Sequence, residues 1–245
     1  MLILTCSACT VRAGRPLVID DADPADQGMF EFETGISYDK DGDTEHWHVP
    51  VVLTYGVLAN LEVGIESGGR IAKEGSSQEE DFSDLFIGAK WRFLQEKKWI
   101  PRMAIAPVVK IPTSSEEAGT SDGKIDSDLS LIASKQLGES VGMHVLAGYG
   151  WTAPLEKEDE NDVLHYGLAL DWQFLETVQW VGEIFAEREL ESDTNTAVLY
   201  NSGFRWSPIE NLTIDFAAGS RLSDDGPDLI ATAGLTWAIG SGKNN

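Results

Sequence analysis

The stretch Met29-Phe-Glu-Phe-Glu-Thr-Gly-Ile-Ser-Tyr38 decides the fold, because apolar and polar side chains alternate along it. Phe30 and Phe32 fall on one side, whereas Glu31 and Glu33 fall on the other. Successive side chains of an extended strand point to opposite faces. The period of two residues therefore predicts a β-strand with one apolar face and one ionic face.

The same alternation recurs along the rest of the chain. It predicts about twelve strands, most of them near ten residues, the length that crosses a bilayer core at the usual tilt. No stretch shows a convincing helical period, so we expect almost no helix. After 29–38, the predicted strands are 46–55, 61–67, 84–93, 101–111, 126–137, 141–151, 164–174, 178–187, 197–206, 212–221 and 228–239.

The connections between these strands alternate between short and long. Outer-membrane barrels have this asymmetry, with tight periplasmic turns and longer outer loops. A soluble β-sandwich has no reason to sort its loops in this way. The short connections are 56–60, 94–100, 138–140, 175–177 and 207–211, and the long ones centre on 41–43, 68–81, 112–124, 153–162, 188–195 and 222–227.

Six tryptophans lie near the ends of the predicted strands, on the apolar side. This placement is typical of the aromatic girdles at the two membrane interfaces. The alternative is a sandwich core, in which tryptophans should gather in the middle of the strands. The six are Trp47, Trp91, Trp151, Trp172, Trp206 and Trp237.

The opposite face mixes acids and bases. Twelve strands enclose a lumen too wide to be filled by valine and leucine side chains, so we place the charges inward and the apolar face toward lipid. The fold predicted for 28–239 is an all-β, transmembrane, up-and-down antiparallel barrel of about 12 strands. Its predicted pore lining is Glu31, Glu33, Glu62, Glu66, Asp84, Lys90, Arg92, Arg102, Lys110, Asp126, Asp128, His144, Asp171, Glu183, Arg205 and Asp215.

The composition excludes some classes of protein. With 245 residues the chain is long enough for one barrel, and its formal charge of −23 argues against nucleic-acid binding. No run of eighteen apolar residues occurs, which excludes a transmembrane helix but leaves open a barrel of alternating strands.

The first residues are apolar and small, and we interpret 1–13 as the back half of a secretory signal whose start is truncated. Both cysteines, Cys6 and Cys9, lie there, so the exported chain would have no disulfide; a lipidated cysteine is the weaker reading. We expect 14–27 to be a periplasmic lead and 240–245 a C-terminal tail, with both barrel ends in the periplasm.

The chain also resembles a known family. Asp81-Phe-Ser-Asp-Leu-Phe-Ile-Gly-Ala-Lys-Trp-Arg-Phe93 and Val109-Lys-Ile-Pro-Thr113 are similar to small, transporter-like outer-membrane proteins linked by name to the meta-cleavage (MetA) pathway of phenol degradation. The family pattern has glycine where Ser83 and Ser114 stand here. Further matches are at 123–128, 134–138 and 146–149, and the resemblance spans roughly residues 28–239. It implies an outer-membrane barrel of about this strand number.

Two constellations suggest chemistry. His46 and His48 are close enough in a strand to share a metal, although polar histidines at the barrel rim are the better reading. Ser134, His144 and Asp171 form a possible row across three inward faces, because a tight turn would place Ser134 opposite His144. Such a row has the members of a nucleophilic triad, but charged lumens also produce such rows by chance.

The sequence favours a channel-like protein of the Gram-negative outer membrane that passes or binds a small solute. The acids near the outer mouth predict a preference for cations or neutral molecules, and the pathway name makes aromatic solutes candidates. The alternatives are a structural barrel plugged by salt bridges and a lumenal hydrolase. We predict no enzyme activity, no cofactor and no dedicated metal site. The expected partners are membrane lipid and lipopolysaccharide, with the oligomeric state open.

Overall fold

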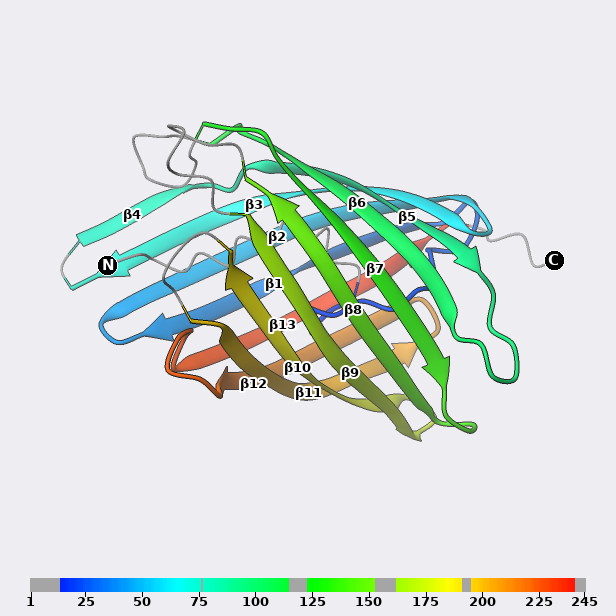
Figure 1. Ribbon diagram of the computed structural model, residues 1–245. Helices are drawn as coiled ribbons and strands as arrows, with labels where there is room; N and C mark the ends of the chain where they lie inside the picture. Colours follow the sequence, from blue (N-terminus) through cyan, green and yellow to red (C-terminus); the bar gives the residue numbers. More distant parts are fainter. Residues whose placement is uncertain (1–13, 76, 115–122, 153–161, 191–194, 241–245) are drawn as a thin grey trace.

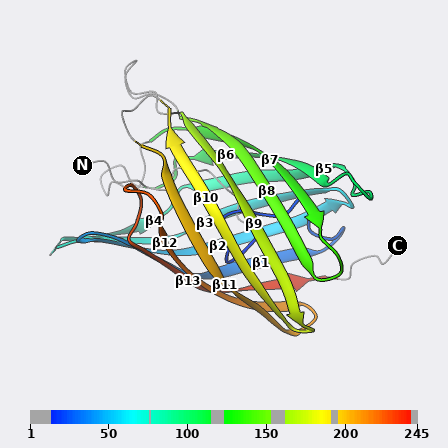
Figure 2. The ribbon, with the colours of Figure 1, turned by 60° about the horizontal axis from the view of Figure 1, so that its bottom comes forward.

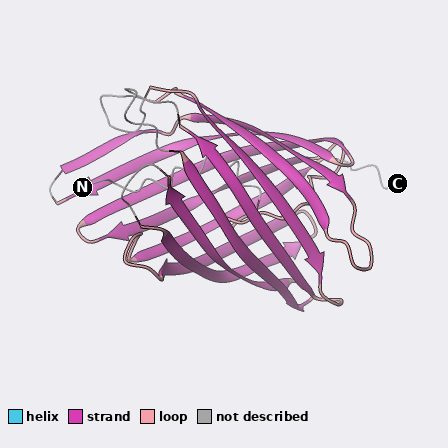
Figure 3. Ribbon diagram, in the orientation of Figure 1, coloured by secondary structure: helices cyan, strands magenta, loops and turns pink. Residues whose placement is uncertain are grey.

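The computed structural model describes residues 14–75, 77–114, 123–152, 162–190 and 195–240. These residues form antiparallel strands joined in a single sheet, drawn magenta in Figure 3. No helix in these ranges is long and apolar enough to cross a membrane. The strands are β1 (Phe30–Asp41), β2 (Thr44–Leu58), β3 (Leu61–Glu74), β4 (Ser77–Phe82), β5 (Leu85–Leu94), β6 (Arg102–Ile111), β7 (Asp126–Gln136), β8 (Val141–Trp151), β9 (Val163–Leu175), β10 (Val178–Glu189), β11 (Ala197–Ile209), β12 (Leu212–Arg221) and β13 (Leu229–Ile239).

The sheet closes on itself as a barrel, which Figures 1 and 2 show from two directions. Apart from β4 and β5, consecutive strands are neighbours, and the first strand pairs with the last from Phe30↔Ile239 to Lys40↔Leu229. The barrel wall is twelve strands around. β4 adds no thirteenth position, because it pairs with the second half of β3, whereas β5 pairs with the first half. The predicted up-and-down barrel of about 12 strands is confirmed.

Two predicted long loops are wrong. The stretch 68–81 is mostly strand, because β3 continues to Glu74 and turns at Gly75 (φ +58°) into β4. The stretch 41–43 is a tight turn, in which Asp41 pairs with Thr44 and Gly42 has a φ of +55°. Glycine adopts such positive φ values without a steric penalty, so both turns can be short.

The apolar face points outward. Val63 and Ile65 on β3 are 44% and 47% exposed, although they belong to the hydrocarbon side of the strand. Trp91, Trp172 and Trp206 are 47%, 50% and 49% exposed, near the strand ends that carry the short turns. Exposed aromatics at the strand ends match the predicted girdle, and the outward apolar surface is that of a membrane barrel.

The N-terminal stretch 14–27 is not a periplasmic lead, because the structure places most of it inside the barrel. Leu17, Ile19 and Ala22 are 4%, 2% and 0% exposed. They pack on apolar side chains of the inner wall, among them Ile132 and Phe185. The segment returns to the barrel end where β1 begins, and Gln27 bridges to Gly56. We call residues 14–27 the inner segment.

The predicted signal segment 1–13 lies outside the described residues, and of the tail 240–245 only Gly240 is described. Much of the long connections 112–124, 153–162 and 188–195 also lies outside them.

Candidate pore and inner segment

The inner segment is tied to a basic part of the wall. Asp20 accepts a hydrogen bond from the Lys90 ammonium on β5 at 2.7 Å, and Lys90 also pairs with Glu62 on β3 at 3.3 Å. Asp23 pairs with both Arg92 on β5 and Arg102 on β6. Because the acids of the segment meet the bases of the wall, the positive charges of Lys90, Arg92 and Arg102 are balanced inside the barrel.

A second set of contacts holds the beginning of the segment against β10, β11 and β12. Arg15 forms an ion pair with Asp215 at 3.3 Å, and Arg205 donates to the Arg15 carbonyl at 2.7 Å. Glu183 accepts from the backbone N–H groups of Val18 (2.9 Å) and Ile19 (2.8 Å). Buried backbone groups need such partners where no neighbouring strand satisfies them. These bonds explain how an irregular segment lies inside the barrel.

The Ser134–His144–Asp171 row exists. Ser134 pairs directly with His144 across the tight turn, as predicted, and its Oγ lies 2.9 Å from His144 Nδ1. His144 Nε2 lies 2.6 Å from the Asp171 carboxylate. The space for that carboxylate depends on Gly142, where a Cβ atom would lie 2.3 Å from Asp171 Oδ2.

Ser134 is fully buried, and its hydroxyl oxygen accepts a hydrogen bond from the inner segment. The Ala22 N–H donates to Ser134 Oγ at 2.9 Å, and Ser134 is 0% exposed. A nucleophile must reach its substrate, and here the inner segment covers the hydroxyl. The Ser134–His144–Asp171 row therefore joins the barrel wall to the inner segment through the hydrogen bond from Ala22 to Ser134.

A second row, which sequence reasoning missed, lies on β7 and β9. Ser130 Oγ donates to Asp128 at 3.0 Å and lies 3.2 Å from His165 Nε2. His165 is 0% exposed, and a Cβ atom at Gly148 would lie 1.8 Å from its ring. The signal was available, because His165 and Asp171 are six residues apart on one strand and therefore share a face.

The other predicted lining residues also lie on the inner face. Lys110 pairs with Asp126 and lies 3.9 Å from Asp84. Asp84 accepts hydrogen bonds from the N–H groups of Thr113 and Ser114 at 3.0 Å, so it orders the start of a loop. Glu31 is half-buried and lies two residues before Glu33 on the same face of β1. The predicted acids and bases thus form several local groups rather than one continuous ring.

Within the part of the chain that the structure describes, His46 and His48 have no third ligand for a metal site. No group of three or more histidine, cysteine or acidic residues within the described ranges has the arrangement of a metal site.

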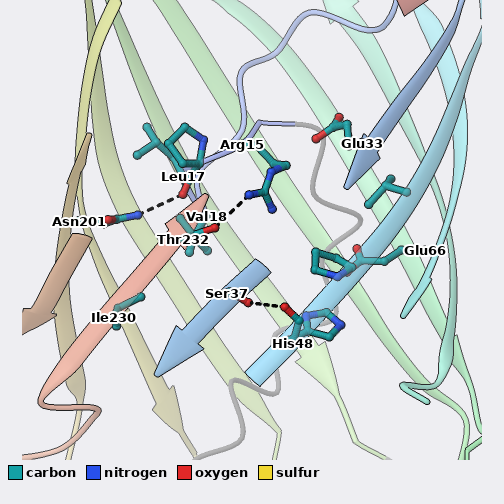
Figure 4. A pocket seen from close by; sticks show the side chains of 13 residues that line it. Arg15, Leu17, Val18, Glu33, Ser37, His48, Glu66, Asn201, Ile230 and Thr232 are labelled. Atoms are coloured by element: carbon teal, nitrogen blue, oxygen red, sulfur yellow. Dashed lines mark hydrogen bonds between the residues drawn. The ribbon is translucent and has the colours of Figure 1, made fainter. Parts of the chain in front are cut away.

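A cavity of about 60 Å³ lies between the inner segment and the wall. Figure 4 shows Glu33, Glu66 and His48 on one side of it, Asn201, Ile230 and Thr232 on the other, and Arg15 between them. Arg15 donates to Thr232 Oγ1 at 3.0 Å, and Asn201 donates to the Pro16 carbonyl at 3.1 Å. Polar side chains therefore lie on both sides of the cavity, and the inner segment forms one of its walls.

Residues 13–239 match the family described as "Putative MetA-pathway of phenol degradation". Among curated proteins, none matches the chain in sequence.

Solved structures share the fold at low sequence identity. A COG4313 outer membrane channel from Pseudomonas putida F1 superposes with a TM-score of 0.65 at 11% identity, covering 91% of this chain and 100% of that one. The porin NanC gives 0.64 at 7% identity, covering 84% and 98%. The monoaromatic hydrocarbon channel CymD gives 0.53 at 7% identity, covering 90% of each chain. The fold is that of an outer-membrane β-barrel.

Proposed function

We propose that this chain, which belongs to the MetA-pathway phenol-degradation family, passes small solutes across the outer membrane through a lumen narrowed by its inner segment. The observation that supports this most is the reversal of polarity relative to a soluble protein, with exposed hydrocarbon outside and ionisable side chains inside. A barrel with an apolar outer surface and charged side chains in its lumen can enclose a polar path for solutes.

The proposed selectivity favours cations and neutral molecules. Among the buried charged side chains of the described residues, nine are carboxylates, whereas Lys90 is the one amine. Arginines such as Arg92 and Arg102 are half-buried, and Asp23 pairs with both. An excess of lumenal carboxylates lowers the energy of cations along the path and raises that of anions.

Small aromatic molecules are the proposed class of solute. The description of the family names phenol degradation, and one structural neighbour is described as a channel for monoaromatic hydrocarbons. Neutral aromatic molecules would not be excluded by an acidic lumen.

Planar-bilayer recordings and liposome swelling test this function together. In a KCl gradient, the purified chain should give a reversal potential that is biased toward cations. Swelling should proceed with small neutral solutes that do not cross lipid unaided, such as arabinose. A clear bias toward anions would reject the proposed selectivity.

A structural barrel with a closed lumen is the second candidate, and the inner segment is the observation that favours it. Ion pairs at Lys90, Arg92, Arg102 and Arg15 bind the segment to several strands at once. If neither swelling nor conductance occurs in a folded preparation, the protein is a scaffold and not a channel.

The geometry gives little support to a lumenal hydrolase. The hydroxyl of Ser134 lies against the Ala22 N–H, so a substrate could reach it only after the inner segment had moved away.

A further inference from the structure

The cavity beside Arg15 contains two buried acceptors without a donor. Glu33 is 1% exposed and Asn201 is 7% exposed. Among the described residues, neither Glu33 Oε2 nor Asn201 Oδ1 has a hydrogen-bond partner. Both oxygens belong to residues that line the same cavity. Buried acceptors of this kind require a donor or a cation, because burial has removed their water.

The nearby bases direct their hydrogen bonds elsewhere. Arg15 bonds to Asp215 and to Thr232, and Lys90 pairs with Asp20 and Glu62. No described residue forms an ion pair with Glu33 in this structure. Glu33 Oε2 therefore lines the cavity without a hydrogen-bond partner among the described residues.

A second carboxylate lies in the same cross-strand row. Glu33 on β1 is opposite Val52 on β2, and Val52 is opposite Glu66 on β3. Glu33 and Glu66 both line the cavity from neighbouring parts of the wall, as Figure 4 shows. The lining contains two carboxyl groups, Glu33 and Glu66, against the single guanidinium of Arg15, so the cavity favours one further positive charge.

The size of the cavity and the chemistry of its free oxygen limit the ligand. The centres of water-sized molecules can occupy about 60 Å³ of the cavity, several times the roughly 10–15 Å³ that one water molecule needs by this measure. An alkali-metal ion with water molecules fits this space and can contact Glu33 Oε2 directly, and a small ammonium ion can donate an N–H to it, whereas choline has no N–H and its methyl groups keep its charge away from the oxygen. The described residues offer no three-ligand cluster for a tightly coordinated metal.

We propose that this cavity binds a small monovalent cation, with the Glu33 carboxylate as its anionic ligand. The site deepens the proposed cation preference of the channel, and it gives the inner segment a second role as one wall of a binding site. Asn201 lies on the opposite side of the cavity.

The test measures the thermal unfolding midpoint of the full chain in detergent. The probes are NaCl, KCl, methylammonium chloride and choline chloride at equal ionic strength. A ligand at ten times its Kd raises the midpoint of a protein of this size by roughly 3–5 °C. The wild-type protein should therefore unfold at a higher temperature in the three small cations than in choline.

Three variants assign the effect to the cavity. Glu33→Gln should remove the difference between small cations and choline, and Glu33→Asp should keep part of it. Glu139→Gln, on an exposed turn, removes the same charge outside the lumen and should keep the full difference.

Two results would overturn the site. One is a wild-type midpoint that is the same in choline as in the small cations, which needs no variant and holds even if Glu33→Gln does not fold. The other is a full difference in folded Glu33→Gln. The readout requires no open pore, so a barrel that fails the swelling assay would refute the channel while leaving the cation site standing.

Discussion

Lys90 Nζ on the barrel wall lies 2.7 Å from Asp20 Oδ2 on the inner segment, and the side chains are 5% and 12% exposed. This ion pair joins the part of the chain that precedes the barrel to the middle of the wall. Since Glu62 lies 3.3 Å from the same ammonium, one lysine balances two carboxylates. The inner segment is therefore held by charge as well as by apolar packing.

Replacing Lys90 should be more damaging than replacing Asp20. Lys90→Met leaves two buried carboxylates without their base, and removal of one partner of a buried ion pair costs about 3–5 kcal/mol. Asp20→Asn should cost less, because Lys90 retains Glu62. The free energy of unfolding measured in urea for both variants and for the double variant gives the coupling. Equal or fully additive losses would contradict the pairing.

Ser134→Ala should reduce stability without changing any esterase activity. The substitution leaves the buried Ala22 N–H without its acceptor, a loss of about 1–3 kcal/mol. Ser220→Ala, whose hydroxyl bonds to a carbonyl near an exposed loop, should change stability much less. Loss of a measurable esterase activity at unchanged stability would instead identify Ser134 as a nucleophile.

Gly148→Ala should destabilise the barrel through His165. The new Cβ would lie 1.8 Å from His165 Nε2, and the ring is fully buried, so the wall must shift. Overpacking of this kind costs about 1–3 kcal/mol. Gly69→Ala is the matched control, because no atom lies within 4 Å of its added Cβ. Equal unfolding midpoints for the two variants would mean that the His165 row is not packed as described.

The turn between β5 and β6 should be sensitive to acid. A hydrogen bond from Lys135 Nζ at 2.6 Å holds the pKa of Glu96 below its usual range. A carboxylate with a lowered folded pKa stabilises the protein above its unfolded pKa of about 4.3, and that contribution disappears as the pH falls through the folded value.

The unfolding midpoint of wild type should accordingly exceed that of Glu96→Gln by a constant amount at neutral pH. The gap should narrow below about pH 4, near the pKa of an unperturbed glutamate. A gap that persists unchanged at pH 3 would show that the Glu96 charge makes no contribution.

The alternation of apolar and polar residues predicted the strands of the barrel wall, because the pattern of each strand is visible within that strand alone. Phe30 and Glu31 point to opposite faces in any extended strand, whatever surrounds them. The tight turn after β7 also fixed the register that places Ser134 opposite His144. By contrast, the loop predicted over 68–81 is wrong, because the ladder continues through Gly69 to Glu74.

The position of the inner segment could not be predicted from the same pattern. Leu17 and Ile19 are apolar residues in a short irregular stretch, and their partners Ile132 and Leu146 lie more than a hundred residues away. Ile132 and Leu146 are apolar side chains on an inner face that is otherwise mainly polar. Such apolar positions are the signal that could have indicated a buried segment. Long-range packing of this kind has no period along the chain.

The position of the inner segment is tested most directly by a cysteine pair. In a chain with Cys6 and Cys9 replaced by serine, Ala22→Cys and Ser134→Cys should be bridged by dibromobimane, which becomes fluorescent when it joins two nearby thiols. Ala22→Cys with Ala133→Cys, one residue along β7 on the lipid face, should remain dark. A fluorescent bridge in the first pair alone places the segment inside the barrel, whereas two freely alkylated thiols in that pair would contradict it.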